Sequence, residues 1–111
     1  MTQKTFGEAV AEARKALRLS QKEFAARVLK EDGTSITPQY LNDIEHDRRS
    51  PTTDHMVAAL ARALNQNAEY FFVLAGKMQP ADVRQAATAG PERVNEAMLA
   101  FRRALSGTGK P

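Results

Sequence analysis

Four hydrogen-bonding side chains in the middle of the chain recur at a helical spacing. Gln39, Asn42, Asp43 and His46 occupy positions i, i+3, i+4 and i+7, so an α-helix would carry them all on one face. An ordinary solvated face is the alternative reading, but such faces are usually built from Lys and Glu, which favour helices. Amide side chains can instead form paired hydrogen bonds with the edge of an adenine base in DNA. The stripe is therefore a candidate for contacts with bases.

Two basic side chains follow this stripe. Arg48 and Arg49 come where the helical periodicity breaks, and guanidinium groups suit phosphate oxygens. A helix that reads base edges, beside side chains that hold the sugar–phosphate backbone, is the arrangement of a helix-turn-helix on DNA. The segment from about residue 37 to residue 49 is therefore predicted to bind DNA.

A short helix must hold these groups, and its start is marked in the sequence. Thr37 offers a hydroxyl at the N-cap, and Pro38 suits the first helical position because a backbone N–H there would have no partner. Leu41 and Ile44, three residues apart, can anchor the other side of the helix in a core. We expect this helix to run from about residue 37 to residue 46.

Two further helices are predicted before it, each with a capping box. Thr5 with Glu8, and Ser20 with Glu23, have the S/T-x-x-E spacing in which side chain and backbone of the two residues satisfy each other. The first helix should run from about residue 5 to residue 18. The side chains expected to face the core are Phe6, Val10, Ala13 and Leu17 in the first helix, and Phe24, Val28 and Leu29 in the second.

A polar segment, residues 30–35, contains Asp32-Gly33 and is predicted to be a turn. Helices are then expected over about 53–64 and 68–75, with Asn65 as a left-handed cap of the first and Asn67 as the N-cap of the second. Their expected core residues are Val57, Leu60, Leu64, Tyr70, Phe71, Val73 and Leu74.

The last part of the chain has a different character. Pro80 begins a short Ala-rich segment, and Gly90-Pro91 stops one helix and starts another that should run to Leu105. The final helix would place four apolar residues on one side, which suits self-dimerisation, a partner protein or packing within the chain. These residues are Val94, Met98, Phe101 and Leu105.

Composition bounds the fold and excludes several kinds of site. The 111 residues suffice for one domain with a short appendage, and the lack of persistent strand-like alternation predicts an all-α fold. The absence of cysteine excludes disulfides, thiolate zinc sites and a cysteine nucleophile. We expect no metal, since His46 and His55 lack companions at ligand spacing.

No catalytic arrangement can be recognised either. The chain has no nucleophile–base pattern, no phosphate-binding glycine loop and no paired-carboxylate cleft, so we expect neither an enzyme nor a cofactor. The net charge of +3 permits nucleic-acid binding without arguing strongly for it. With no apolar run of transmembrane length and no signal-like start, we expect a cytoplasmic protein without membrane contact, nucleoid-associated when bound to DNA.

From about Phe6 to Gly76 the chain resembles the Cro/cI-type (XRE) helix-turn-helix family of phage repressors. Several motifs at the right spacings carry this resemblance, and together they are far more specific than any one alone. They are Arg14, Leu19-Ser20-Gln21-x-x-Phe24-Ala25, Ile44-Glu45 with Arg49-Ser50-Pro51, and Leu60-Ala61-x-x-Leu64 before the aromatic-rich fifth helix. The resemblance implies a five-helix domain whose third helix enters the major groove, usually as a dimer on a two-fold operator.

The resemblance also implies roles for individual residues. It assigns base contacts to Gln39 and Asp43, with Asn42 as an adjacent candidate. Tyr40 either reaches a thymine methyl group or a phosphate, or packs in a half-buried position. Phosphate contacts fall to Gln21 at the amino end of the second helix and to Arg48, Arg49 and Ser50 after the third. Arg14 and Glu45 match a pair that forms an ion pair between the first and third helices.

The chain departs from the family pattern in two places. The turn over residues 30–35 is about five residues longer than usual, and its extra residues either touch the DNA backbone or extend into solvent, which we favour. Pro38 stands where many relatives have a polar side chain that reads bases, which shifts readout to Gln39, Tyr40 and Asn42. Asp43 is open to two roles: it accepts from a cytosine amino group, or it pairs with one of the following arginines.

These observations predict the organisation and the function of the chain. Residues 1–77 should be the DNA-binding domain, 78–105 a C-terminal helical extension capable of dimerisation, and 106–111 a disordered tail. The expected function is a transcriptional regulator, a repressor, that binds double-stranded DNA as a homodimer. The alternative is an antitoxin or interaction protein in which the same domain binds DNA and the last helix holds a protein partner, a toxin.

Overall fold

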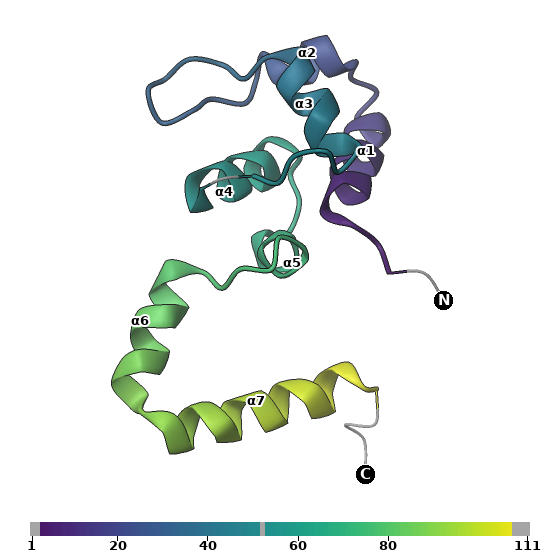
Figure 1. Ribbon diagram of the computed structural model, residues 1–111. Helices are drawn as coiled ribbons and strands as arrows, with labels where there is room; N and C mark the ends of the chain where they lie inside the picture. Colours follow the sequence, from purple (N-terminus) through teal and green to yellow (C-terminus); the bar gives the residue numbers. More distant parts are fainter. Residues whose placement is uncertain (1–2, 52, 108–111) are drawn as a thin grey trace. The chain divides into compact units, whose positions relative to one another are not determined.

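The computed structural model describes residues 3–51 and 53–107. Within them the chain forms seven α-helices and no strand, which confirms the all-α prediction (Figure 1). The helices fall into two compact units, Met1–Met78 with α1 to α5 and Gln79–Pro111 with α6 and α7. Their bounds are α1 Phe6–Ala16, α2 Gln21–Ala25, α3 Pro38–Glu45, α4 Asp54–Ala63, α5 Ala68–Leu74, α6 Pro80–Ala89 and α7 Pro91–Leu105.

The first three helices begin where their caps predict. The Thr5 hydroxyl accepts from the Glu8 N–H at 3.1 Å, and the Glu8 carboxylate accepts from the Thr5 N–H at 3.0 Å. Ser20 and Glu23 form the second capping box in the same way, at 3.0 and 2.9 Å. Thr37 caps α3 by accepting from the backbone N–H three residues on, at 3.0 Å. Each cap satisfies an N–H group that the helix itself leaves without a partner.

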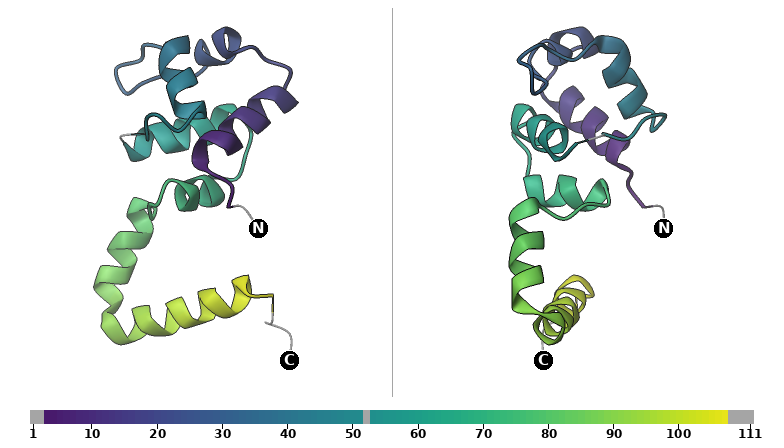
Figure 2. Two further views of the ribbon diagram at one scale, coloured as in Figure 1. Left: turned by 45° about the vertical axis from the view of Figure 1, so that its right-hand side comes forward. Right: turned by 60° about the vertical axis from the view of Figure 1, so that its left-hand side comes forward.

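The first unit is built around one apolar core, and α3 is fixed to it by Leu41 and Ile44, which are 0% and 1% exposed. α3 packs on α1 and α2, and α5 packs on α4 and α1 (Figure 2). The rings of Phe6 in α1 and Phe71 in α5 meet edge to face with centroids 5.6 Å apart. The other large side chains that are fully buried are Val10, Phe24, Val28, Val57, Leu60 and Leu64.

Two residues predicted to face the core from the first two helices are exposed instead. Leu17 lies beyond the last residue of α1 and is 44% exposed, because the chain changes direction at Arg18, which has a left-handed φ of 61°. Leu29 lies beyond the end of α2 and is 50% exposed. It forms an isolated antiparallel bridge with Ser35, and the alternation of an extended segment turns Val28 inward and Leu29 outward.

α5 presents only two of its four predicted core residues, Phe71 and Leu74, to the core. Phe71 is buried as expected, and its neighbour Phe72 is buried with it. Tyr70 and Val73, three residues apart on one side of the helix, are exposed at 49% and 57%. The prediction of core positions for Tyr70 and Val73 is therefore wrong. A seven-residue helix has one inward side, and Phe71, Phe72 and the partly buried Leu74 occupy it.

The caps predicted for the helices after α3 are confirmed. Asn65 follows α4 in the left-handed region with φ 58°, and Asn67 caps α5 by accepting from the Tyr70 N–H at 3.0 Å. Gly90, with φ 93°, separates α6 from α7, a conformation that L side chains rarely adopt. Residues 106 and 107 of the predicted disordered tail form a turn after α7, and residues 108–111 lie outside the described residues.

Candidate functional site

The side of α3 opposite its apolar anchors carries the predicted reading residues. Gln39 and His46 are exposed, and Asn42 and Asp43 are half-buried. None of the four is enclosed in the interior. A helix anchored by two aliphatic side chains thus presents a polar stripe outward.

A buried ion pair joins the C-terminal end of α3 to α1. The Arg14 Nε donates to Glu45 Oε2 at 2.6 Å and Nη2 donates to Oε1 at 3.0 Å, so the contact is bidentate. Arg14 Nη1 also donates to the Leu19 carbonyl oxygen at 2.8 Å. Both charged side chains are buried, and each is satisfied by the other. The pair fixes how α3 is placed on α1 and on the turn before α2.

Gln21 connects this ion pair to the polar stripe on the outward side of α3. Its Nε2 donates to Glu45 Oε1 at 2.9 Å and to Asn42 Oδ1 at 3.1 Å. The resemblance assigned Gln21 to phosphate, whereas here its amide nitrogen is turned toward α3. Because the Asn42 oxygen is held, the Asn42 Nδ2 is the group of this side chain that remains free to donate. Residues 21 and 42 are too far apart in the chain for the sequence to indicate this contact.

A second cluster forms around Asp43. Its Oδ1 accepts from Gln39 Nε2 at 3.0 Å and from Arg48 Nε at 3.2 Å, and Arg48 Nη2 is also 3.2 Å away. The carboxylate is therefore paired with a cation that offsets its negative charge. Gln39 gives its nitrogen to this contact, which leaves its Oε1 as a hydrogen-bond acceptor at the protein surface.

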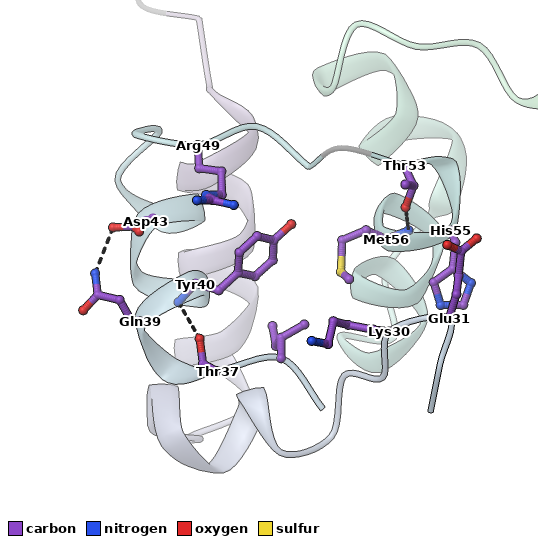
Figure 3. A pocket seen from close by; sticks show the side chains of 11 residues that line it. Lys30, Glu31, Thr37, Gln39, Tyr40, Asp43, Arg49, Thr53, His55 and Met56 are labelled. Carbon is purple, nitrogen blue, oxygen red and sulfur yellow. Dashed lines mark hydrogen bonds between the residues drawn. The ribbon is translucent and has the colours of Figure 1, made fainter. Parts of the chain in front are cut away.

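Arg49 and Tyr40 make a different contact. The Arg49 guanidinium carbon lies 5.3 Å from the centroid of the Tyr40 ring, a cation–π arrangement (Figure 3). Burial raises the pKa of Tyr40, and the positive charge of Arg49 opposes that shift. Within the described residues Arg49 makes no ion pair, so its charge is available to an anion. Ser50, next to it, is exposed.

The end of α3 is also tied to the start of α1 by Asp47, a contact that the sequence did not indicate. Asp47 Oδ2 accepts from the Thr5 hydroxyl at 2.6 Å, and Oδ1 accepts from the Gly7 N–H at 3.0 Å. The two backbones approach so closely that a Cβ on Gly7 would lie 2.3 Å from the Ile44 carbonyl oxygen. Only glycine fits at this crossing of α1 and α3.

The long turn between α2 and α3 folds as a small hairpin. The Ile36 N–H donates to the Val28 carbonyl at 2.9 Å, and the Lys30 N–H donates to the Thr34 carbonyl at 2.7 Å. At its tip Asp32 accepts from the Thr34 N–H and hydroxyl, and these hydrogen bonds, the hydroxyl's first, lower the pKa of Asp32. Residues 29–35 are all exposed.

An open groove of about 490 Å³ lies between this hairpin, α3 and the start of α4 (Figure 3). Its floor includes Ile36 and Met56, and charges of both signs line it. His55 Nε2 donates to the Leu29 carbonyl at 3.1 Å and so connects α4 to the hairpin. Gln39, Tyr40 and Asp43 line the groove on the α3 side, so it adjoins the outward polar stripe.

The four apolar residues predicted to share one side of the last helix all lie in α7, in the second unit. Val94 and Met98 are half-buried, and Phe101 and Leu105 are exposed. Within the described residues, no group of three or more His, Asp or Glu side chains could hold a metal ion. Nor does that part of the chain contain a helix with the length and apolar character needed to cross a membrane.

Comparison with known proteins gives one match. The family model described as Helix-turn-helix matches residues 10–71, more than half of the chain. No match was found among curated proteins or among solved structures. The matched span reaches from α1 into α5 and includes every residue of the two clusters around α3.

Proposed function

Because the chain belongs to the Cro/cI-type helix-turn-helix family, a DNA-binding regulatory family and not an enzymatic one, we propose that it is a sequence-specific transcriptional repressor. It binds a palindromic operator as a homodimer, with α3 of each copy in a major groove. Such a protein works in the cytoplasm, on the nucleoid.

One observation carries this proposal: α3 is buried on one side and offers oriented amide groups on the other. Gln39 presents its Oε1, an acceptor suited to the amino groups of adenine or cytosine. Asn42 presents its Nδ2, a donor suited to purine N7, guanine O6 or thymine O4. Both groups are held by neighbours before DNA arrives, which lowers the entropy lost on binding.

The phosphate contacts surround this stripe. Among the residues that the structure describes Arg49 has no ion-pair partner, and Ser50 is exposed next to it. Arg48 is partly neutralised by Asp43, so it serves more to hold Gln39 and Asp43 in place than to bind phosphate. Gln21 orients Asn42, and its Oε1 can still accept from a neighbouring group. Tyr40 is held under Arg49, close to the groove beside α3.

The experiment that tests the proposal is selection of bound fragments from a random DNA pool. The expected result is a palindrome whose half-sites lie about one helical turn, roughly 10 base pairs, apart. A pool that shows no enrichment after several rounds would sink the proposal. Enrichment of a single, unrepeated half-site would retain DNA recognition and overturn the dimer.

The exposed apolar side of α7 supports a second candidate function. An antitoxin combines a DNA-binding domain with a segment that holds a toxin, and Phe101 and Leu105 are exposed at 45% and 69%. A toxin-like neighbouring gene whose product forms a stable complex with this chain would favour that function. A chain that is a well-behaved dimer when purified alone favours the repressor.

A further inference from the structure

The hairpin of residues 28–36 is fixed to the rest of the first unit at several points. Val28 and Ile36, at its two ends, are 1% and 4% exposed, and the Ile36 N–H donates to the Val28 carbonyl oxygen at 2.9 Å. His55 of α4 binds the Leu29 carbonyl oxygen at 3.1 Å, which ties the base of the hairpin to a second helix. A surface segment held in this way presents its side chains in defined positions.

Lys30 lies at the base of this hairpin and extends into the groove beside α3 (Figure 3). Its backbone N–H donates to the Thr34 carbonyl oxygen at 2.7 Å, whereas its ammonium group has no ion-pair partner among the described residues. Arg49, which also has no ion-pair partner there, lines the same groove from the α3 side, beside the Tyr40 ring. Two cations therefore face one groove from different walls.

The acidic groups that line the groove leave this charge in excess. Asp43 Oδ1 lies 3.2 Å from Arg48 Nη2, so its charge is already paired. Glu31 lies beside His55 on the α4 wall, away from α3 (Figure 3). The part of the groove between the two cations is therefore positively charged and suits an anion.

The position of the groove beside α3 determines which anion it meets. A helix with its side chains is about 10–12 Å wide and the DNA major groove is about 12 Å wide, so an inserted helix has a sugar–phosphate strand close to each flank. Gln39 and Asp43 of the polar stripe line the groove, whereas Asn42 is turned toward Gln21 on the other flank of α3. With α3 in a major groove, one of the two strands passes along the groove that the two cations line.

We propose that the hairpin is a second DNA-binding element, in which the Lys30 ammonium group binds a phosphate of this strand. The inference rests on the proposed function, because it takes α3 to lie in the major groove. It gives a role to the long turn, a segment for which the sequence alone favours solvent. The contact belongs to the base of the hairpin, since the Asp32 carboxylate at its tip repels phosphate.

Replacement of single phosphates of the selected operator by uncharged methylphosphonates tests this contact. The natural chain should lose about tenfold in affinity when the phosphate bound by Lys30 is replaced. Lys30→Gln should lose about tenfold on the unmodified duplex and show no further loss at that one phosphate, because the contact is already absent. Fluorescence anisotropy at low salt measures the four affinities of this cycle.

Arg27→Gln is the matched control, since it removes the same charge from an exposed residue that does not line the groove. It should retain the natural sensitivity at that phosphate. Both variants change exposed side chains, so their thermal melts should overlay that of the natural chain. An unchanged affinity of Lys30→Gln, or losses that add at every phosphate, would overturn the proposal.

The hairpin contact and the proposed function can fail separately. If the natural chain prefers one sequence and Lys30→Gln matches it at every phosphate, only the hairpin contact is refuted. If the natural chain binds all sequences alike, the proposed function is refuted, and a random duplex still tests the contact. There Lys30→Gln should reduce the slope of log K against log salt by about 0.9, and Arg27→Gln should reduce it less. A chain that binds no duplex refutes both.

Discussion

Gln21 at the start of α2 donates a hydrogen bond from Nε2 to Asn42 Oδ1 in α3, at 3.1 Å. The same nitrogen donates to Glu45, which is held by the buried Arg14. An unbroken set of hydrogen bonds therefore runs from the interior of the first unit to the outward stripe of α3. The orientation of Asn42 therefore depends on Gln21, Glu45 and the buried Arg14.

The contact makes a specific prediction for Gln21→Ala. Since Asn42 loses the group that orients it, affinity for the selected operator should fall about tenfold, with a smaller loss on random DNA. Binding of labelled duplexes of both kinds, followed by fluorescence anisotropy, measures the two losses. Lys22→Ala, the next and exposed residue, is the matched control. Equal losses on both DNAs would mean that Gln21 acts only on phosphate.

Arg14→Ala should destabilise the fold. The change leaves the Glu45 carboxylate buried without its cation, a situation that typically costs about 3–5 kcal/mol. Urea unfolding followed by circular dichroism gives the free energy of unfolding. Lys15→Ala, exposed on the same helix, should change it by less than about 0.5 kcal/mol. An unfolding curve for Arg14→Ala that overlays the natural one would contradict the structural role of the pair.

Gln39→Ala should relax discrimination at one or two base positions. Loss of its contact costs about 1–3 kcal/mol on the best sequence, and less on sequences that already differ there. Affinities for a panel of single-base operator variants measure this loss position by position. A uniform loss across the panel would show that Gln39 does not read bases.

Arg49→Ala and Arg48→Ala should behave differently, although the residues are neighbours. Arg49 makes no ion pair within the described residues, so its loss should weaken binding to all sequences and reduce the slope of log K against log salt by about 0.9. Arg48 is paired with Asp43, so its loss should alter the slope less and sequence preference more. Titrations at several salt concentrations on operator and random DNA separate the two effects, and identical slopes would contradict the distinction.

Acid should weaken the start of α2 through Glu23. Hydrogen bonds from the Ser20 N–H and hydroxyl group lower the pKa of Glu23 below its ordinary value of 4.5. A carboxylate with a lowered pKa stabilises the fold above that ordinary value, and this contribution is lost as the pH falls below it toward the folded pKa. As the pH is lowered from 4.5, the melting temperature of Glu23→Gln should therefore fall less than that of the natural chain. Glu31→Gln controls for removal of a negative charge, and a parallel loss in Glu23→Gln and the natural chain would contradict the assignment.

Local features of the sequence predicted the scaffold well. The caps at Thr5, Ser20 and Thr37 and the anchors Leu41 and Ile44 involve residues within a turn or two of one another, so their spacing is sufficient evidence. The prediction of core positions for Leu17 and Leu29 is wrong, because the apolar spacing of the sequence continues past the helix ends. The helical backbone stops before these two residues.

The contacts that complete the site were harder to predict. Gln21 meets Asn42, and Asp47 meets Gly7, only after three helices have packed, and no local pattern encodes either pair. The hairpin of residues 28–36 shows a similar limit. Asp32-Gly33 indicates a turn, but the pairing of Leu29 with Ser35 depends on the flanking segments being held side by side.

Gly7 is a sensitive point of this fold, because α1 crosses α3 there with no room for a side chain. A methyl group there would have to push the whole of α3 away from α1, since the obstacle is the Ile44 carbonyl oxygen and not a flexible side chain. α3 would then tilt as a rigid body, with every one of its own residues unchanged. A single added carbon could thus weaken the proposed DNA binding without altering any side chain that is proposed to meet DNA.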